Sequence, residues 1–338
     1  MIANDLKISV LGAGSWGTAL AALLASKGYA VTIWAYEDEV CRQINEGSEN
    51  VTYLPGFKLS GNLKASSSIE DVIGSSQLVL SVVPSHVARN ILSKAAGLIT
   101  ADHIFVSATK GIEIDTLMTN SQIVEEILPE RVADNAAYLS GPSFAREVAA
   151  QLPTAVTVAS KSTEIAKKVQ KIFSTSYFRV YSSNDIIGLE VGGSIKNVIA
   201  LGAGISDGLG FGYNARAALI TRGLAEMTRL GLALGAKAST FSGLSGMGDL
   251  VLTCTGDLSR NRSVGIKIGE GEKIDAILSD MNMVAEGVKT AKAAYLLAEK
   301  LRIDMPICES IYKILYEDME PREAVSSLMA RDLKEEIC

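Results

Sequence analysis

The chain has 338 residues, of which 48% are hydrophobic, and its formal net charge is −6. This length suffices for two domains of ordinary size, each with its own core. The acidic balance and the lack of Lys/Arg clusters disfavour nucleic acid as a partner, because that binding depends on neutralising many phosphates.

No basic segment followed by an apolar one precedes the first predicted strand, so we expect no signal peptide and a cytoplasmic protein. Polar residues interrupt the most apolar stretches long before these could cross a bilayer, and we expect no membrane span. The four cysteines are Cys41, Cys254, Cys308 and Cys338. Their scattered positions, with no C-x-x-C and no nearby histidine pair, argue against a disulfide framework and against a metal site.

A glycine-rich loop follows the first predicted strand. Gly12, Gly14 and Gly17 have the G-x-G-x-x-G spacing, which lets backbone amides approach a pyrophosphate at the start of a helix. The predicted elements around the loop are a strand over residues 7–11, a helix over 18–26 and a strand over 30–34. This order is typical of the dinucleotide-binding turn of a Rossmann domain.

Short β-branched runs alternate with helical stretches up to about residue 183 and then give way to long helical segments. The later predicted strands cover residues 78–83, 104–107, 155–158 and 178–181, and the predicted helices cover 189–206, 215–234, 284–301 and 308–316. We therefore expect an α/β fold. An N-terminal Rossmann-type domain with a mostly parallel sheet, residues 1–184, precedes an all-helical domain, residues 185–338.

Lys196 lies in the first helix of the second domain, with Gly192 and Gly193 one turn before it and Ala200 one turn after it. These small neighbours predict bare helix surface that a small polar molecule can reach. A lysine desolvated there, or placed near another cation, has a lowered pKa and is a usable base near neutral pH. A surface lysine without a chemical role is the alternative.

This first helix and the segment after it are also rich in glycine, which weakens a helix by roughly 1 kcal/mol per residue relative to alanine. Either close helix packing or a ligand that needs room must compensate for that loss.

Oxidation of an alcohol needs a group that takes the hydroxyl proton, and many dehydrogenases use histidine. The chain has two histidines, His86 just after one predicted strand and His103 at the start of the next. Both positions also suit a structural role. Lysine is therefore the favoured base.

Further clusters lie near predicted turns. Lys110 follows the predicted strand over residues 104–107, at the end where open α/β sheets bind ligands, although a solvated loop lysine is equally compatible. Gly141 and Ser143 flank Pro142 in a turn that either lines a ligand or only stiffens the chain.

Asp249 lies upstream of Ser259 and Arg260 in the second half of the chain. Ser259 is expected to cap a helix whose amides, with the planar Arg260 beside them, suit a phosphate dianion. A plain capped helix is the alternative. We expect these clusters to outline a cleft between the domains, in which Asp249 pairs with Lys196 and orients it.

In combination these motifs closely resemble the bacterial NAD(P)-dependent glycerol-3-phosphate dehydrogenases over nearly the full chain. The matching segments are GAGSWGTA, VVPS, ATKGIE, LSGPSFA, GGSIKNV, GLSGMGDL and LSRNR. The resemblance implies a reversible hydride transfer between NAD(P)H and dihydroxyacetone phosphate that gives sn-glycerol 3-phosphate for phospholipid synthesis. It also implies that the helical domain, residues 185–338, is the substrate-binding and catalytic domain, and that the protein forms a homodimer through it.

The resemblance assigns roles to individual residues. Lys196 matches the proton acceptor, with Lys110 and Asp249 expected beside it. The predicted substrate-binding residues are Lys110, Gly141, Ser143, Lys196, Asn197, Asp249, Ser259, Arg260 and Asn261. The predicted cofactor-binding residues are Gly12, Gly14, Ser15, Trp16, Gly17, Tyr36, Lys110, Ala145, Arg260, Val284 and Glu286.

Some alternatives stay open. Ala35 and Tyr36 stand at the end of the second predicted strand, where an acidic residue indicates NAD and a nearby arginine indicates NADP, so both cofactors are possible. A β-hydroxyacid dehydrogenase is a second hypothesis, but its helix lysine typically precedes an asparagine by one turn, whereas Asn197 is adjacent to Lys196. A third is a non-catalytic dinucleotide sensor.

Overall fold

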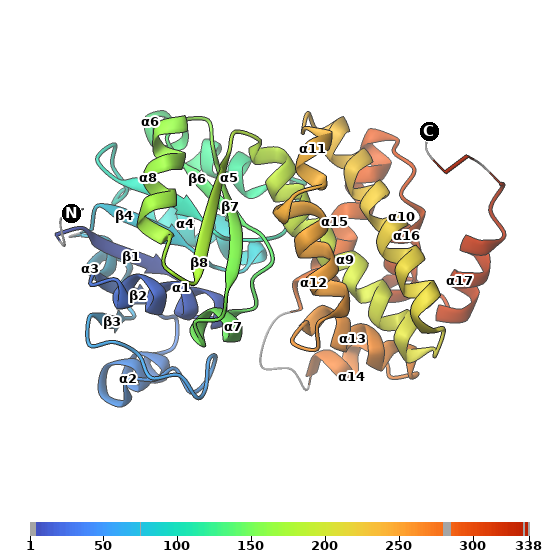
Figure 1. Ribbon diagram of the computed structural model, residues 1–338, viewed down its shortest axis with the longest axis horizontal. Coiled ribbons are helices and arrows are strands. Elements are labelled where there is room, and N and C mark those ends of the chain that lie inside the picture. The colour runs from blue at the N-terminus through green and yellow to red at the C-terminus, as the bar shows by residue number, and fades with distance from the viewer. Residues whose placement is uncertain (1–4, 75, 280–284, 334, 337–338) are drawn as a thin grey trace.

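The computed structural model describes residues 5–74, 76–279, 285–333 and 335–336. Figure 1 shows two halves side by side along the longest axis, one a sheet flanked by helices and the other a bundle of helices. The strands are β1 (Lys7–Leu11), β2 (Ala30–Trp34), β3 (Leu63–Ser66), β4 (Leu78–Ser81), β5 (Ile104–Ser107), β6 (Ala137–Ser140), β7 (Thr154–Ser160) and β8 (Phe178–Ser183).

Helices of the sheet-containing half lie between these strands. They are α1 (Ser15–Ser26), α2 (Asp38–Gly47), α3 (Ile69–Ile73), α4 (Ser85–Ala95), α5 (Asn120–Ile127), α6 (Glu130–Ala133), α7 (Ala145–Ala149) and α8 (Thr163–Phe173). The helical half contains α9 (Ile186–Gly208), α10 (Gly212–Ala233), α11 (Ala238–Phe241), the π-helical turn η1 (Leu244–Gly248), α12 (Asp249–Thr255), α13 (Arg260–Gly269), α14 (Ile274–Ser279), α15 (Glu286–Leu301), α16 (Pro306–Tyr316) and α17 (Pro321–Met329).

The sheet has the order β3-β2-β1-β4-β5-β6-β7-β8. All neighbouring strands are parallel except β6 and β7, which are antiparallel. The strand order reverses between β1 and β4, because β2 and β3 lie on one side of β1 and the later strands lie on the other. In doubly wound folds, ligands bind beside such a switch point. The glycine loop after β1 lies at this point, so the expected α/β fold with a mostly parallel sheet is confirmed.

All six strands predicted from the sequence are present, with ends that differ by at most two residues. The sequence analysis does not predict β3 and β6. Each is only four residues long, and neither LKAS nor AYLS contains the β-branched residues that mark the other strands. The first helix begins at Ser15, three residues earlier than predicted, so the glycine loop leads directly into it.

Successive side chains of the central strands point to opposite faces of the sheet, and apolar residues lie on both faces. On one face Ile8 and Val10 belong to a buried cluster with Leu24 of α1. On the other face Val79 of β4 is buried in a cluster with Leu92 of α4. The helical half has its own core, built mainly around α9.

Helix α9 is the central helix of the helical half and contacts α10, α12, α13 and α15. Asp185 caps it by accepting a hydrogen bond from the Gly188 amide at 2.9 Å. Among the described helices, α9 is the one long and apolar enough to cross a membrane by length and composition, but 89% of its most apolar window is buried inside the protein.

Glycines let α9 and α13 meet backbone to backbone. A Cβ atom on Gly204 would lie 2.1 Å from the carbonyl oxygen of Arg262 and 2.9 Å from Cα of Gly265. A Cβ atom on Gly208 would lie 2.3 Å from the carbonyl oxygen of Ile266. Close helix packing is therefore the compensation for these glycines, one of the two that the sequence analysis allows.

We expect Gly204→Ala to lower the free energy of unfolding by about 1–3 kcal/mol, because the added methyl group forces α9 and α13 apart. Gly47→Ala is the control, since nothing lies within 4 Å of a Cβ atom at this exposed helix end. Its effect is expected within about 0.5 kcal/mol of zero. Urea denaturation measures both; equal losses in the two variants would contradict the packing argument.

Candidate active site

The candidate site lies where the carboxyl edge of the sheet meets α9, α12 and α13. Several side-chain contacts join the halves of the molecule there, and two of them link predicted site residues. Lys110, three residues beyond β5, places its Nζ 3.2 Å from Oδ2 of Asp249 at the start of α12. Arg260, at the start of α13, donates from Nη2 to Oγ of Ser15 in the glycine loop at 2.7 Å.

Lys196, Asp249 and Lys110 form one buried ionic cluster. Lys196 Nζ lies 2.5 Å from Asp249 Oδ1 and donates to Oγ1 of Thr253 at 3.0 Å. The side chains of Asp249 and Lys196 are only 1% and 7% exposed, and that of Lys110 is 17% exposed. The expected pairing of Asp249 with Lys196 is confirmed, and the same carboxylate also holds Lys110.

Burial lowers the pKa of Lys196 to about 8; the negative charge of Asp249 opposes this shift, and the positive charge of Lys110 adds to it. An amine with this pKa exchanges its proton readily near neutral pH, which suits a general acid and base. Because Lys196 is buried and paired, the surface-lysine alternative is wrong.

The space beside the glycines that precede Lys196 is filled, which corrects the expectation of bare helix surface. A Cβ atom on Gly192 would lie 2.2 Å from the carbonyl oxygen of Ser245 in η1. A Cβ atom on Gly193 would lie 2.6 Å from Oγ of Ser140 at the end of β6. The glycines here admit neighbouring backbone and side chain, a use that the sequence pattern does not distinguish from an open surface.

The start of α13 has the features of an anion site. Ser259 caps the helix by accepting a hydrogen bond from the Arg262 amide at 3.3 Å, as expected. Asn261 donates from Nδ2 to Oδ1 of Asn197 at 3.0 Å, and its own Oδ1 accepts from the Gly287 amide at 2.9 Å. These bonds tie the start of α13 to α15 and to Asn197, the neighbour of Lys196 on α9, and they fix the first-turn amides and Arg260 relative to that helix.

The glycine loop fits a dinucleotide. A Cβ atom on Gly17 would lie 1.9 Å from the carbonyl oxygen of Gly12, whose φ of +112° is itself in the left-handed region, so these two glycines make the tight turn. Beside Gly14, at the N-cap of α1, nothing lies within 4 Å of a Cβ position. The open space at this helix start suits a pyrophosphate. Trp16 Nε1 nearby is buried and has no hydrogen-bond partner within the described residues.

Other predicted cofactor residues lie just after β2 and at the start of α15. Tyr36 follows β2 and is 81% exposed. Glu286, the first residue of α15, accepts a hydrogen bond from Oγ of Ser85 at 2.8 Å, which joins the helical half to the start of α4. Burial raises the pKa of Glu286. Val284 lies outside the described residues.

The turn after β6 carries the remaining predicted residues. Gly141 has a φ of +143°, and a Cβ atom there would lie 2.9 Å from Cα of Val156 on β7. Ser143 Oγ donates to the carbonyl oxygen of Gly141 at 3.0 Å, and Ala145 begins α7. The turn is therefore rigid, and it lies next to the strand end that reaches α9.

Neither histidine belongs to the lysine cluster. His103 Nδ1 lies 3.0 Å from the Thr100 amide and stabilises the turn before β5. His86 lies in the first turn of α4. Among the described residues no hydrogen bond or ion pair joins either histidine to Lys196, which agrees with the preference for lysine. In the same ranges no three His, Cys, Asp or Glu residues gather as a metal site.

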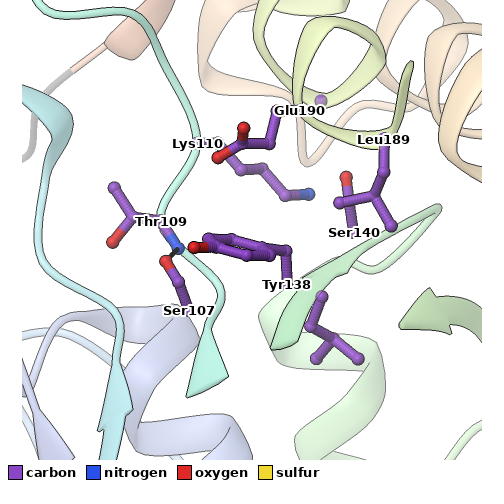
Figure 2. A pocket seen from close by; sticks show the side chains of 9 residues that line it. Ser107, Thr109, Lys110, Tyr138, Ser140, Leu189 and Glu190 are labelled. Atoms are coloured by element: carbon purple, nitrogen blue, oxygen red, sulfur yellow. Dashed lines mark hydrogen bonds between the residues drawn. The ribbon is translucent and has the colours of Figure 1, made fainter. Parts of the chain in front are cut away.

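A small pocket lies behind Lys110, between the sheet and α9 (Figure 2). Its volume is about 10 Å³, roughly enough for one water molecule. It is lined by Ser107, Thr109, Lys110, Tyr138, Leu139, Ser140, Leu189, Glu190 and Gly193. Among these, the sequence analysis singles out Lys110 and Gly193, and it does not single out the polar residues Ser140 and Glu190. It also misses Thr253, although the four-residue spacing from Asp249 places both on one helix face.

Comparison with known proteins covers nearly the whole chain. Residues 7–166 match the family model described as NAD-dependent glycerol-3-phosphate dehydrogenase N-terminus, and residues 185–326 match the model of its C-terminus. A protein of Syntrophotalea carbinolica named glycerol-3-phosphate dehydrogenase [NAD(P)+] is 58% identical over 332 residues, which are 98% of this chain and 100% of that protein. A protein of the same name from Geobacter sp. (strain M21) is 58% identical over 330 residues, 98% of each chain.

Among solved structures, the glycerol-3-phosphate dehydrogenase of Coxiella burnetii superposes with a TM-score of 0.93 at 40% identity, covering 97% of this chain and 100% of that one. The sequence resemblance and the fold are thus supported by independent comparisons. With both family models matched and relatives at 58% identity over nearly their full length, the chain belongs to the NAD-dependent glycerol-3-phosphate dehydrogenase family.

Proposed function

We propose that the chain transfers a hydride reversibly between NAD(P)H and dihydroxyacetone phosphate, giving sn-glycerol 3-phosphate for phospholipid synthesis. The observation that carries this proposal is the buried cluster of Lys196, Asp249 and Lys110, in a site where Arg260 at the start of α13 also contacts Ser15 of the glycine loop. The names of the curated relatives support the reaction, and they include both cofactors. The preference between NAD and NADP stays open.

The cofactor would be held by the residues of the glycine loop. Open space beside Gly14 and the amides at the start of α1 would receive the pyrophosphate, and Trp16 Nε1, which has no hydrogen-bond partner among the described residues, offers a further donor. When bound, the nicotinamide supplies the hydride for C2 of the substrate. Roles for Tyr36, Ala145, Val284 and Glu286 rest on the family resemblance.

The substrate phosphate is assigned to the start of α13. Amides of the first turn and the guanidinium of Arg260 provide charge-assisted donors there. Ser259 and Asn261 shape this turn through their own hydrogen bonds. The rigid turn that holds Gly141 and Ser143 is assigned to the other side of the substrate, from the resemblance.

The proton step belongs to Lys196. In the reduction, its ammonium gives a proton to the C2 oxygen as C2 receives the hydride; in the oxidation, the neutral amine takes that proton back. Lys110 polarises the same oxygen, and the negative Asp249 between the two amines limits their repulsion. Water exclusion from the buried cluster strengthens each of these interactions.

The first experiment adds dihydroxyacetone phosphate to the purified protein and follows the loss of reduced-nicotinamide absorbance, with NADH and NADPH in parallel. Turnover supports the proposal, and the ratio of the two rates gives the cofactor preference. Folded protein that binds nucleotide but shows no turnover with either cofactor would favour the sensor hypothesis. Turnover only with an unphosphorylated hydroxyacid would favour the β-hydroxyacid dehydrogenase.

The pKa of Lys196 predicts opposite pH profiles in the two directions. The protonated amine is the acid of the reduction, so kcat/KM for dihydroxyacetone phosphate should fall as the pH rises through about 8. The neutral amine is the base of the oxidation, so kcat/KM for glycerol 3-phosphate should rise across the same interval. Steady-state rates in both directions measure this, and profiles that move together would contradict the assignment.

We further propose two domains, residues 1–184 and 185–338, in a cytoplasmic homodimer. The strand β8 ends at Ser183, and Asp185 caps the first helix of the second domain, which supports this boundary. The dimer through the helical domain follows from the family resemblance. Light scattering tests it against the chain mass of 35.7 kDa.

A further inference from the structure

Helix α9 carries Lys196 and also contacts the segment that carries Lys110. That segment is the loop between β5 and α5, residues 108–119. Lys110 lies near one end of this loop, and the first turn of α5 follows the other end. Within the described residues, Ser194 of α9 bonds Gly111 in the loop and Glu190 of α9 bonds Ser121 just after it; the two are four residues apart and share one face of the helix.

Ser194 holds the Lys110 end of the loop. Its Oγ accepts a hydrogen bond from the Gly111 amide at 3.0 Å and donates to the carbonyl oxygen of Glu190 at 2.7 Å. Ser194 is 1% exposed, so water does not compete for this bond. The backbone directly after Lys110 is therefore fixed to the helix turn that leads to Lys196.

Glu190 holds the other end of the loop. Its carboxylate accepts hydrogen bonds from the amide of Ser121 at 2.7 Å and from Oγ of Ser121 at 2.5 Å. Ser121 lies in the first turn of α5, where a helix favours negative charge. Burial raises the pKa of Glu190 to about 7, although the hydrogen bonds that it accepts from this turn lower the pKa.

Between these two contacts, Gly193 of α9 leaves room for the aliphatic part of the Lys110 side chain. A Cβ atom on Gly193 would lie 3.8 Å from Cγ of Lys110, and 2.6 Å from Oγ of Ser140. Figure 2 shows the Lys110 side chain crossing the pocket beside Glu190. The amine ends 3.2 Å from Asp249, which is itself bound to Lys196. Helix α9 therefore carries Lys196 and, through these contacts, also fixes the position of Lys110.

We propose that Ser194 and Glu190 are positioning residues, which fix the loop after β5 to α9. They thereby hold the Lys110 amine at the reacting centre, at a fixed position relative to Lys196. This inference rests on the proposed function, because Lys110 matters only if it acts on the substrate. Neither residue needs to contact substrate or cofactor. Their effect on the rate passes through Lys110.

A double-mutant cycle tests the proposal, because residues that act through one another are not additive. Ser194→Ala is expected to lower kcat for dihydroxyacetone phosphate by roughly tenfold in the wild-type background, since a small displacement of a catalytic group is costly. In a Lys110→Ala background, the same change is expected to lower kcat by less than about twofold. Lys110→Ala keeps Lys196, so its residual rate is followed at high enzyme concentration.

Ser206→Ala is the matched control. Ser206 is also a buried serine of α9, but its Oγ has no hydrogen-bond partner within the described residues. Its loss is expected to change kcat by less than about twofold in either background. Hydrogen exchange at residues 108–119 adds a direct readout: Ser194→Ala should speed exchange there, and Ser206→Ala should not.

Three outcomes overturn the proposal: no loss with Ser194→Ala, the same loss in both backgrounds, or an equal loss with Ser206→Ala. Should Ser194→Ala fail to fold, Glu190→Gln takes its place in the cycle, because it keeps the volume and replaces one acceptor oxygen by a donor. If the wild-type chain shows no turnover, the proposed function fails. If it turns over and the losses are additive, this inference alone fails.

Discussion

Replacing Lys196 by methionine is expected to lower kcat/KM for dihydroxyacetone phosphate by about 10²–10⁴-fold, the usual contribution of a general acid. Methionine has a similar length and is apolar, so it fills the buried space but carries no proton. The loss should appear in both directions of the reaction, because the same amine gives and takes the proton. Nucleotide binding, measured by fluorescence titration, is expected to stay unchanged.

The fold should survive this substitution for an electrostatic reason. Removing one partner of a buried ion pair normally leaves an uncompensated charge, which is strongly destabilising. Here Asp249 keeps Lys110 at 3.2 Å, so its charge stays paired. Lys168→Met, at an exposed position of α8, is the control for the loss of a lysine as such. Full turnover by folded Lys196→Met protein would show that another group moves the proton.

Local sequence patterns predict the positions of the main helices and strands, but they predict only some of the residues that meet in the site. Lys196 stands out because small residues surround it in a helix, and Lys110 because it follows a strand that ends at the ligand-binding edge. The bond between Lys196 and Asp249 is also predicted, since both lie in clusters expected at one cleft. In these cases the residue type and its local setting were enough to single out residues that the structure brings into contact.

Where sequence reasoning fails, the missing information is tertiary. Glu190 bonds Ser121 across 69 residues, and Ser194 bonds Gly111 across 83 residues. In the sequence, Glu190 and Ser194 are ordinary polar positions of a helix. The glycines before Lys196 show the same limit, because a gap that a neighbouring chain fills and a gap open to a ligand look alike until the neighbour is placed.

Replacing Arg260 by lysine is expected to lower kcat/KM for dihydroxyacetone phosphate by roughly 10- to 100-fold, mainly through a higher KM. Lysine keeps the charge but loses the planar fork that binds two phosphate oxygens at once. It also loses the donor that reaches Ser15 at 2.7 Å, so the link between α13 and the glycine loop weakens. A higher KM for the reduced nicotinamide should accompany the loss.

Two controls isolate the phosphate contact. At saturating reduced nicotinamide, unphosphorylated dihydroxyacetone should be turned over almost equally by the wild type and by Arg260→Lys, because the lost phosphate interaction is not used. Arg262→Lys changes the neighbouring arginine of the same helix, which is occupied by Asp207 at 2.9 Å and Asp257 at 3.0 Å. Arg262→Lys should lower the free energy of unfolding and leave the KM for dihydroxyacetone phosphate unchanged. If both arginine variants raise KM for the phosphorylated substrate alike, the general positive charge of α13 binds the phosphate, and the specific geometry of Arg260 does not.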